Sequence, residues 1–198
     1  MLLVELTAVP DAALPLAQLR EHLRLGSGFE DDALQDGLLG SFLRAAIAAV
    51  EARTGKALLR RSFALTVPAW RRPDRQPLPL APASAVAEVA VLPPTGAPMI
   101  VPPGAWRLQP DWTSPELVAV AGALPMIPTG GQARVTFTAG FGPGWADVPA
   151  DLAQAVLMLA AHYYDFRHDM GLSAGCMPFG VTALIERHRP LRLSGGLA

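Results

Sequence analysis

Residues 32–58 read DALQDGLLGSFLRAAIAAVEARTGKAL, an alanine- and leucine-rich stretch without proline. The acidic residues 30–32 favour a helix start, because negative charge stabilises the N-terminal end of a helix dipole. Thr54 and Gly55 are expected to end this helix after Arg53. Only one narrow stripe of the helix is small or polar, and the rest of its surface is apolar. We therefore expect other parts of the protein to cover the helix on two sides. The apolar positions are Leu34, Leu38, Leu39, Phe42, Leu43, Ile47 and Val50.

Proline content separates the middle of the chain from its flanks. Sixteen of the twenty prolines lie between Pro68 and Pro149. This middle part is also rich in Val, Thr and Gly, which is typical of short strands joined by turns. Proline-rich connections favour a small antiparallel sheet. The expected strands are 62–67, 86–92, 105–108, 117–121 and 133–138.

The flanks are helix-permissive in composition. Apolar spacing predicts a first helix over 15–25, a third over 149–168 and a short last helix over 181–188. We therefore expect an α+β fold, with a mainly α-helical core of three to four helices and a proline-rich, small antiparallel β insertion. The expected division is 1–60 and 146–190 for the helical core, 61–145 for the β-rich insertion and 191–198 for a C-terminal tail.

Composition and charge exclude several classes of protein. Apolar residues make up 51% and charged residues 17% of the 198 residues, so the chain has enough apolar surface to fold. A formal net charge of -1 argues against bulk electrostatic binding to nucleic acid or to an anionic membrane. The single cysteine, Cys176, forms no intrachain disulfide, and residues 1–10 lack the basic start of a signal peptide. We expect a protein that is soluble and intracellular where it is made.

Three patterns resemble chemical sites but lack the necessary spacing. In Gly140-x-Gly142 a proline follows directly, which removes an amide donor, and the next helix begins too far on for a phosphate loop. His162 and His168 are six residues apart and would lie on opposed helix faces, so the group that they form with Asp165 and Asp169 is expected to be a solvated helix end. Cys176 has no His nearby in the sequence. We expect no catalytic residue, no metal and no cofactor, and an enzyme is the least favoured class.

Two basic clusters remain. The first, a possible contact for DNA or a partner, consists of Arg60, Arg61, Arg71, Arg72 and Arg75. Such clusters bind phosphates or acidic protein partners, and they also occur as ordinary solvated arginines. Both interpretations stay open for this cluster and for the second one. The second cluster surrounds Pro190 and alternates with leucine, which is typical of an extended segment that binds a partner. Its members are Arg187, Arg189, Leu191, Arg192 and Leu193.

Several short motifs occur in a fixed order along most of the chain. They are residues 22–25, 30–34, 45–46, 50–58, 78–82, 135–142, 148–149 and 187–190. Each is degenerate alone, but the ordered set resembles the head-to-tail connector (adaptor) proteins of long-tailed phages, which also occur in gene transfer agents. The resemblance implies a structural subunit in a ring of about twelve copies under the portal protein. Double-stranded DNA would pass through the lumen, and a stopper or another tail-proximal neck protein would lie on the other side.

The resemblance also implies a location and sets of contact residues. The protein would be made in the bacterial cytoplasm and end in the neck of a virion or phage-like particle, without a membrane. We expect the second basic cluster to bind the portal, and the helix of residues 32–53 to contact the neighbouring subunit through Leu38, Phe42 and Ile47. The alternative is a stand-alone nucleic-acid-binding regulatory module, which would be a soluble monomer with salt-sensitive affinity for DNA.

Overall fold

A computed structural model describes residues 1–25, 32–167 and 177–189 of the chain. Two compact units make up the fold. One, the β unit, consists of Met1–Pro10 and Ala57–Asp147. The other, the helical unit, is built from Asp11–Lys56 and Val148–Ala198.

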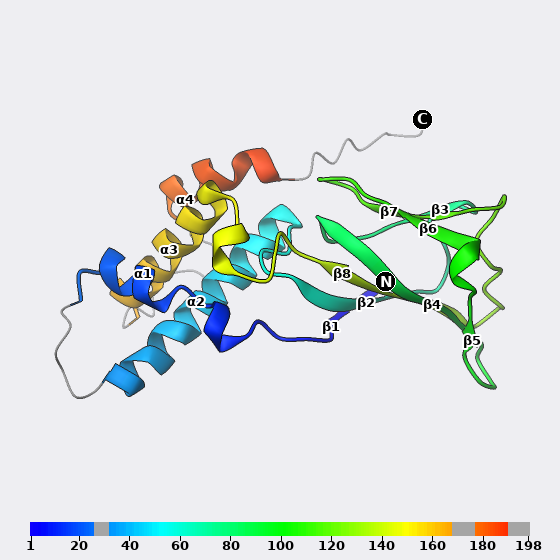
Figure 1. Ribbon diagram of the computed structural model, residues 1–198, viewed down its shortest axis with the longest axis horizontal. Coiled ribbons are helices and arrows are strands. Elements are labelled where there is room, and N and C mark those ends of the chain that lie inside the picture. Colours follow the sequence, from blue (N-terminus) through cyan, green and yellow to red (C-terminus); the bar gives the residue numbers. More distant parts are fainter. Residues whose placement is uncertain (26–31, 168–176, 190–198) are drawn as a thin grey trace. The chain divides into compact units, whose positions relative to one another are not determined.

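The β unit contains two antiparallel sheets (Figure 1). The larger sheet has the strand order β1-β2-β8-β4-β5, and the smaller has the order β3-β7-β6. The strands are β1 (Leu2–Glu5), β2 (Arg61–Val67), β3 (Arg75–Pro77), β4 (Ala83–Leu92), β5 (Met99–Ile100), β6 (Trp106–Gln109), β7 (Glu116–Ala119) and β8 (Gln132–Ala139). Short 3-10 helices lie at Pro103–Ala105 and Trp145–Asp147.

Alternation along the strands gives the β unit its own core. In β8 every second residue is buried, because successive side chains point to opposite faces of a sheet. Phe137 of β8 stacks on Phe63 of β2, with ring centroids 5.8 Å apart. Leu117, on the smaller sheet, belongs to the same buried cluster as these two rings. Both sheets therefore share one apolar interior.

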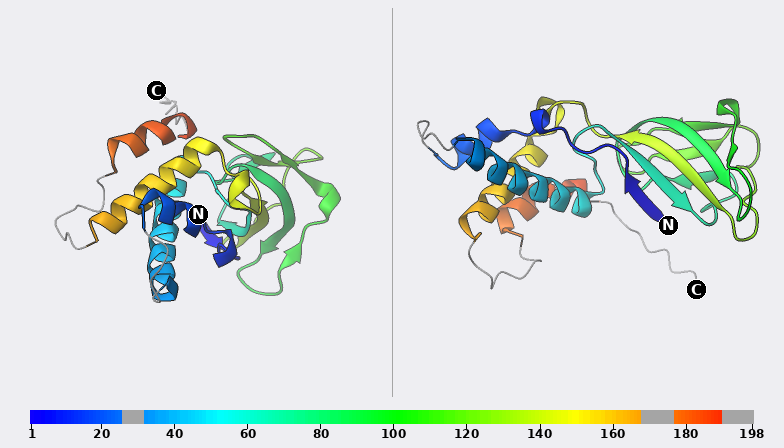
Figure 2. Two further views of the ribbon diagram at one scale, coloured as in Figure 1. Left: turned by 60° about the vertical axis from the view of Figure 1, so that its left-hand side comes forward. Right: turned by 90° about the horizontal axis from the view of Figure 1, so that it is seen from below.

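The helical unit packs three helices against α3 (Ala150–Asp165), which contributes a long buried face. α3 lies between α2 (Asp32–Thr54) and α4 (Phe179–Ile185), as Figures 1 and 2 show. α1 (Leu16–His22) is short because Arg24 adopts a left-handed backbone conformation, with φ of 54°, directly after it. Two 3-10 helices, Asp11–Ala13 and Glu186–His188, complete this unit.

The expectation of a mainly helical core with a small β insertion is wrong. The described chain has four α-helices and eight strands in two antiparallel sheets, which is a mixed α+β fold. The five expected strands are present, but β1, β3 and β5 were not predicted. These three have two to four residues each, too few for an alternating pattern to be recognised. Residues 1–10 also lie in the β unit, whereas the sequence had suggested the helical part.

Candidate functional site

His162, near the end of α3, packs against aromatic rings. The ring of His162 lies 4.6 Å from that of Phe166. Among the described residues, no group of three or more His, Cys, Asp or Glu side chains is placed to hold a metal ion. His168, Asp169 and Cys176 lie outside the described residues. In the same described part, no helix combines the length and the apolar character needed to cross a membrane.

The glycine-rich turn after β8 is a close crossing of two backbone segments. Gly140 has a φ of 132°, and a Cβ atom there would lie 2.5 Å from the backbone of Arg60. The amide of Arg60 donates a hydrogen bond to the carbonyl of Gly142 at 2.8 Å. A Cβ at Gly142 would meet the carboxyl group of Asp147 at 2.2 Å. The absence of side chains at these two glycines therefore permits the two segments to approach this closely.

Two arginines of the first basic cluster, Arg61 and Arg75, form ion pairs within the β unit. Arg61 has a side chain only 5% exposed, and its guanidinium lies 3.0 Å from the carboxylate of Glu5 on β1. Its carbon Cζ also lies 5.2 Å from the centroid of the Phe63 ring. Arg61 thus ties β1 to the sheet and is not available to a partner.

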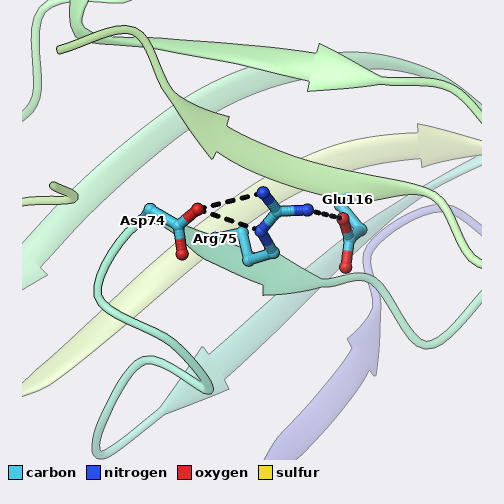
Figure 3. A network of polar contacts seen from close by, with 3 residues as sticks. All are labelled: Asp74, Arg75 and Glu116. Carbon is cyan, nitrogen blue, oxygen red and sulfur yellow. Dashed lines mark hydrogen bonds and ion pairs between the residues drawn. The ribbon is translucent and has the colours of Figure 1, made fainter. Parts of the chain in front are cut away.

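Arg75 of β3 is bound by two carboxylates (Figure 3). It donates hydrogen bonds to Asp74 through Nε and one terminal nitrogen, at 3.0 Å each, and to Glu116 of β7 at 3.2 Å. The hydrogen bonds from Arg75 lower the pKa of Asp74, and the positive charges of Arg75 and Arg72 add to this effect. The charge of Arg75 is therefore compensated within the chain.

The other three arginines of that cluster, Arg60, Arg71 and Arg72, are exposed. Arg71 and Arg72 line a groove of about 350 Å³ in the β unit, which we name the Trp70 groove. The groove is lined by Pro68, Ala69, Trp70, Arg71, Arg72, Pro73, Ala123, Leu124, Met126 and Ile127. No local pattern in the sequence indicates its apolar part, because residues 68–73 and 123–127 are far apart along the chain.

The second basic cluster is connected to the start of α3. Nε of Arg187 and Nε2 of His188 each lie 2.6 Å from Oδ2 of Asp151. Burial raises the pKa of Asp151. The hydrogen bonds with His188 and with the Leu152 amide, together with the nearby positive charges, lower this pKa by more than burial raises it, so the net shift is downward. Arg189 pairs with Glu186 at 3.1 Å. Leu191, Arg192 and Leu193 lie outside the described residues.

The predicted subunit-contact residues of α2 differ in exposure. Leu38 is 42% exposed, whereas Ile47 is 2% exposed and belongs to the core of its own subunit. Phe42 makes an edge-to-face contact with Tyr164 of α3, at 6.3 Å between ring centroids. Within the described residues, the open face of α2 consists of small side chains around Leu38. These are Gly37, Ser41, Ala45, Ala48 and Ala52.

The strand β1 has an exposed apolar edge that the sequence did not predict. Leu2 and Val4 are exposed, while Leu3 between them packs against the core of the β unit. Met1 and Leu6 extend this apolar edge. The alternation of Leu2, Leu3 and Val4 spans too few residues to have signalled a strand.

No protein-family model matches the chain, and neither does any curated protein. Solved structures do match. The chain is 53% identical to a chain in the neck of an empty gene transfer agent (GTA) particle computed with C6 symmetry, with 99% of both chains covered and a TM-score of 0.89. It is 52% identical to a chain in the virion of a native GTA particle, with the same coverage and a TM-score of 0.85. In the neck of a native GTA particle computed with C12 symmetry, the identity is 50%, the coverage is again 99% of both chains and the TM-score is 0.83.

Proposed function

Because this chain belongs to the head-to-tail connector (adaptor) family of long-tailed phages and gene transfer agents, we propose that it forms a closed ring of about twelve copies between the portal protein and the tail. It is a structural component of the neck of a virion or phage-like particle. The observation that carries the ring proposal is the 50% identity, over 99% of the chain, to a subunit of a neck computed with C12 symmetry.

The open face of α2 is the proposed contact between neighbouring subunits. Copies related by a rotation axis meet through two different surfaces, and such contacts repeat until the ring closes. Leu38 offers exposed apolar surface on this face, and the small side chains of Ser41, Ala45 and Ala48 leave room for a neighbour to approach closely. Ile47 supports this face from inside its own subunit.

The second basic cluster, near the C-terminus, is the proposed portal contact. The side chains of Arg187 and Arg189 are 72% and 54% exposed although each is in an ion pair. An Arg guanidinium can form paired hydrogen bonds with an acidic side chain of a partner, and Leu191 and Leu193 would fill apolar pockets. The Asp151 contacts place the start of this segment against α3.

Passage of DNA through the ring does not require tight binding by this subunit. Affinity for duplex DNA depends on the number of cations that neutralise phosphates. Arg61 and Arg75 are already compensated by carboxylates, and the formal net charge is -1. These features support a subunit past which duplex DNA slides, with a stopper or another neck protein on the tail side.

The ring proposal is tested by adding a charge to the open face of α2. Ala48→Glu places a carboxylate on this exposed face, and Ala17→Glu does the same on the exposed surface of α1 as a matched control. We expect Ala48→Glu to lower the amount of this protein in purified particle necks at least about tenfold, because a buried unpaired charge disfavours an interface. Ala17→Glu should leave that amount unchanged, and neither variant should shift thermal unfolding. Complete necks on Ala48→Glu particles, seen by electron microscopy, would contradict the contact. Wild-type necks with only one or two copies of the protein would contradict the ring.

A further inference from the structure

The Trp70 groove is formed by two loops that are held together by hydrogen bonds. Nε1 of Trp70 donates to the carbonyl of Pro125 at 2.7 Å. The amide of Leu124 donates to the carbonyl of Pro73, also at 2.7 Å. Because these bonds exist in the single subunit, the groove is shaped before any partner arrives, and less conformational entropy is lost on binding.

A buried side chain orients the arginine side of the groove. The amide of Arg71 donates a hydrogen bond of 2.9 Å to Oε1 of Gln76, which is buried within β3. Arg75, the next cation along the chain, is already held by Asp74 and Glu116 (Figure 3). Arg71 and Arg72 form no ion pair within the described residues, and both are exposed. The groove therefore presents two exposed guanidinium groups without an ion pair, and Arg72 is near enough to Asp74 to lower the pKa of that carboxyl group.

Apolar side chains make up most of the remaining lining. Met126 is 86% exposed and Ile127 is half-buried, whereas Leu124, which also lines the groove, is buried. Exposed apolar surface gains free energy when a partner covers it. The DNA backbone offers charged phosphates and only the small apolar surface of its sugars, whereas a protein segment can offer both a carboxylate and a large apolar side chain. The lining of the Trp70 groove thus favours a protein segment over DNA as its binding partner.

More than half of the acidic side chains in the described part of the chain are already engaged. Eight acidic side chains in the described part pair with its own cations: Glu5, Asp11, Asp36, Asp74, Glu88, Glu116, Asp151 and Glu186. A carboxylate for Arg71 and Arg72 therefore comes more readily from a different protein than from a second copy. We propose that the Trp70 groove docks an extended segment of another particle protein, one that carries one or two carboxylates beside an apolar side chain.

The occupant can be identified by cross-linking in assembled particles, so the experiment rests on the proposed neck location. A photoreactive amino acid replaces Met126, and the copies of this protein in the neck are counted separately. We expect a cross-link to a protein segment that contains Asp or Glu next to an apolar residue. Normal neck incorporation without any cross-link, or with cross-links only to DNA or to another copy of this chain, would overturn the docking site. Absence of the protein from the neck would instead contradict the proposed function.

Charge reversal provides the matched control. In an Arg71→Glu/Arg72→Glu background, the cross-link yield should fall at least tenfold, while thermal unfolding stays unchanged because both side chains are exposed. Reversal of the cross-linked acidic residue of the partner to Lys should restore the yield in this background. A yield that does not respond to the double reversal would show that the two arginines do not recognise the partner.

Discussion

Arg61 carries a positive charge into the interior of the β unit, where contacts must replace its lost hydration. Its side chain is 5% exposed, and its carboxylate partner, Glu5, lies on the short edge strand β1. The carbonyl of Leu59 accepts a further hydrogen bond from Nε at 3.3 Å. This single residue therefore links the first residues of the chain to a strand that begins more than fifty positions later.

We predict that Glu5→Gln lowers the free energy of unfolding by about 1–3 kcal/mol, because it removes the carboxylate that faces the buried guanidinium of Arg61. The matched control is Glu88→Gln. Glu88 lies 3.8 Å from Arg134, and both side chains are about 40% exposed, so its loss should cost less than about 1 kcal/mol. Urea unfolding followed by tryptophan fluorescence measures both values. Equal losses of unfolding free energy in the two variants would show that the burial of Arg61 does not increase the loss.

Asp151 makes the stability of the helical unit depend on acid pH. Its pKa in the folded chain is lower than its ordinary value, so its contacts stabilise the fold above the ordinary Asp pKa of about 3.9. This stabilisation is lost as the pH falls through the lowered folded pKa. We predict that Asp151→Asn reduces the unfolding free energy at pH 7 by about 1 kcal/mol, and that wild type and variant converge once the pH has fallen below the lowered folded pKa.

Asp165→Asn is the control for this measurement, because Asp165 is exposed at the other end of the same helix. It should change the unfolding free energy by less than about 0.5 kcal/mol at pH 7. A difference between wild type and Asp151→Asn that stays constant as the pH falls from 7 through the lowered folded pKa would mean that the carboxylate charge contributes nothing.

At the scale of elements, α2 and the C-terminal segment have separate roles. One side of α2 is buried through Leu39, Leu43 and Val50, and its other side remains open in the single subunit. The short helix Glu186–His188 is held to α3 through Asp151, whereas the chain beyond it carries the leucines of the proposed portal contact. Truncation can therefore remove the proposed portal contact and keep the contacts of Glu186–His188 with Asp151.

Truncation after His188 is predicted to leave a folded subunit that no longer joins portal-bearing heads. It keeps the Asp151 contacts but removes Arg189, Leu191, Arg192 and Leu193. Circular dichroism checks the fold, and co-sedimentation with heads checks the association. A shorter truncation after Ser194 keeps all of these residues and should associate normally. Normal yields of joined particles with the longer truncation would refute the portal contact.

At the scale of the whole molecule, charge compensation separates a neck subunit from a nucleic-acid-binding regulator. The formal net charge is -1, and two of the five arginines in the first basic cluster are paired internally. We predict that the isolated protein does not bind duplex DNA with a Kd below about 10 µM at 0.15 M salt. Fluorescence anisotropy at several salt concentrations measures this affinity. Tight binding that weakens steeply with salt would favour the regulator.

Local patterns were sufficient for much of the fold. Proline content and β-branched residues located β2, β4, β6, β7 and β8, and apolar spacing located the four helices. The order of short motifs indicated the adaptor family, which similarity to GTA neck chains supports at 50–53% identity. Each of these signals is contained within one segment or in the order of segments, so the sequence alone carries it.

Tertiary structure decided which residues are available at the surface. The sequence could not distinguish Arg61, which is buried beside Glu5, from the exposed Arg71, or Ile47, which is in the core, from Leu38 on the open face of α2. It also could not bring Trp70 and Met126 to one groove, since they are 56 positions apart. The sequence by itself determined the main elements and the family. Burial, ion pairing and the groove arise between segments distant along the chain, so only the packed structure decides them.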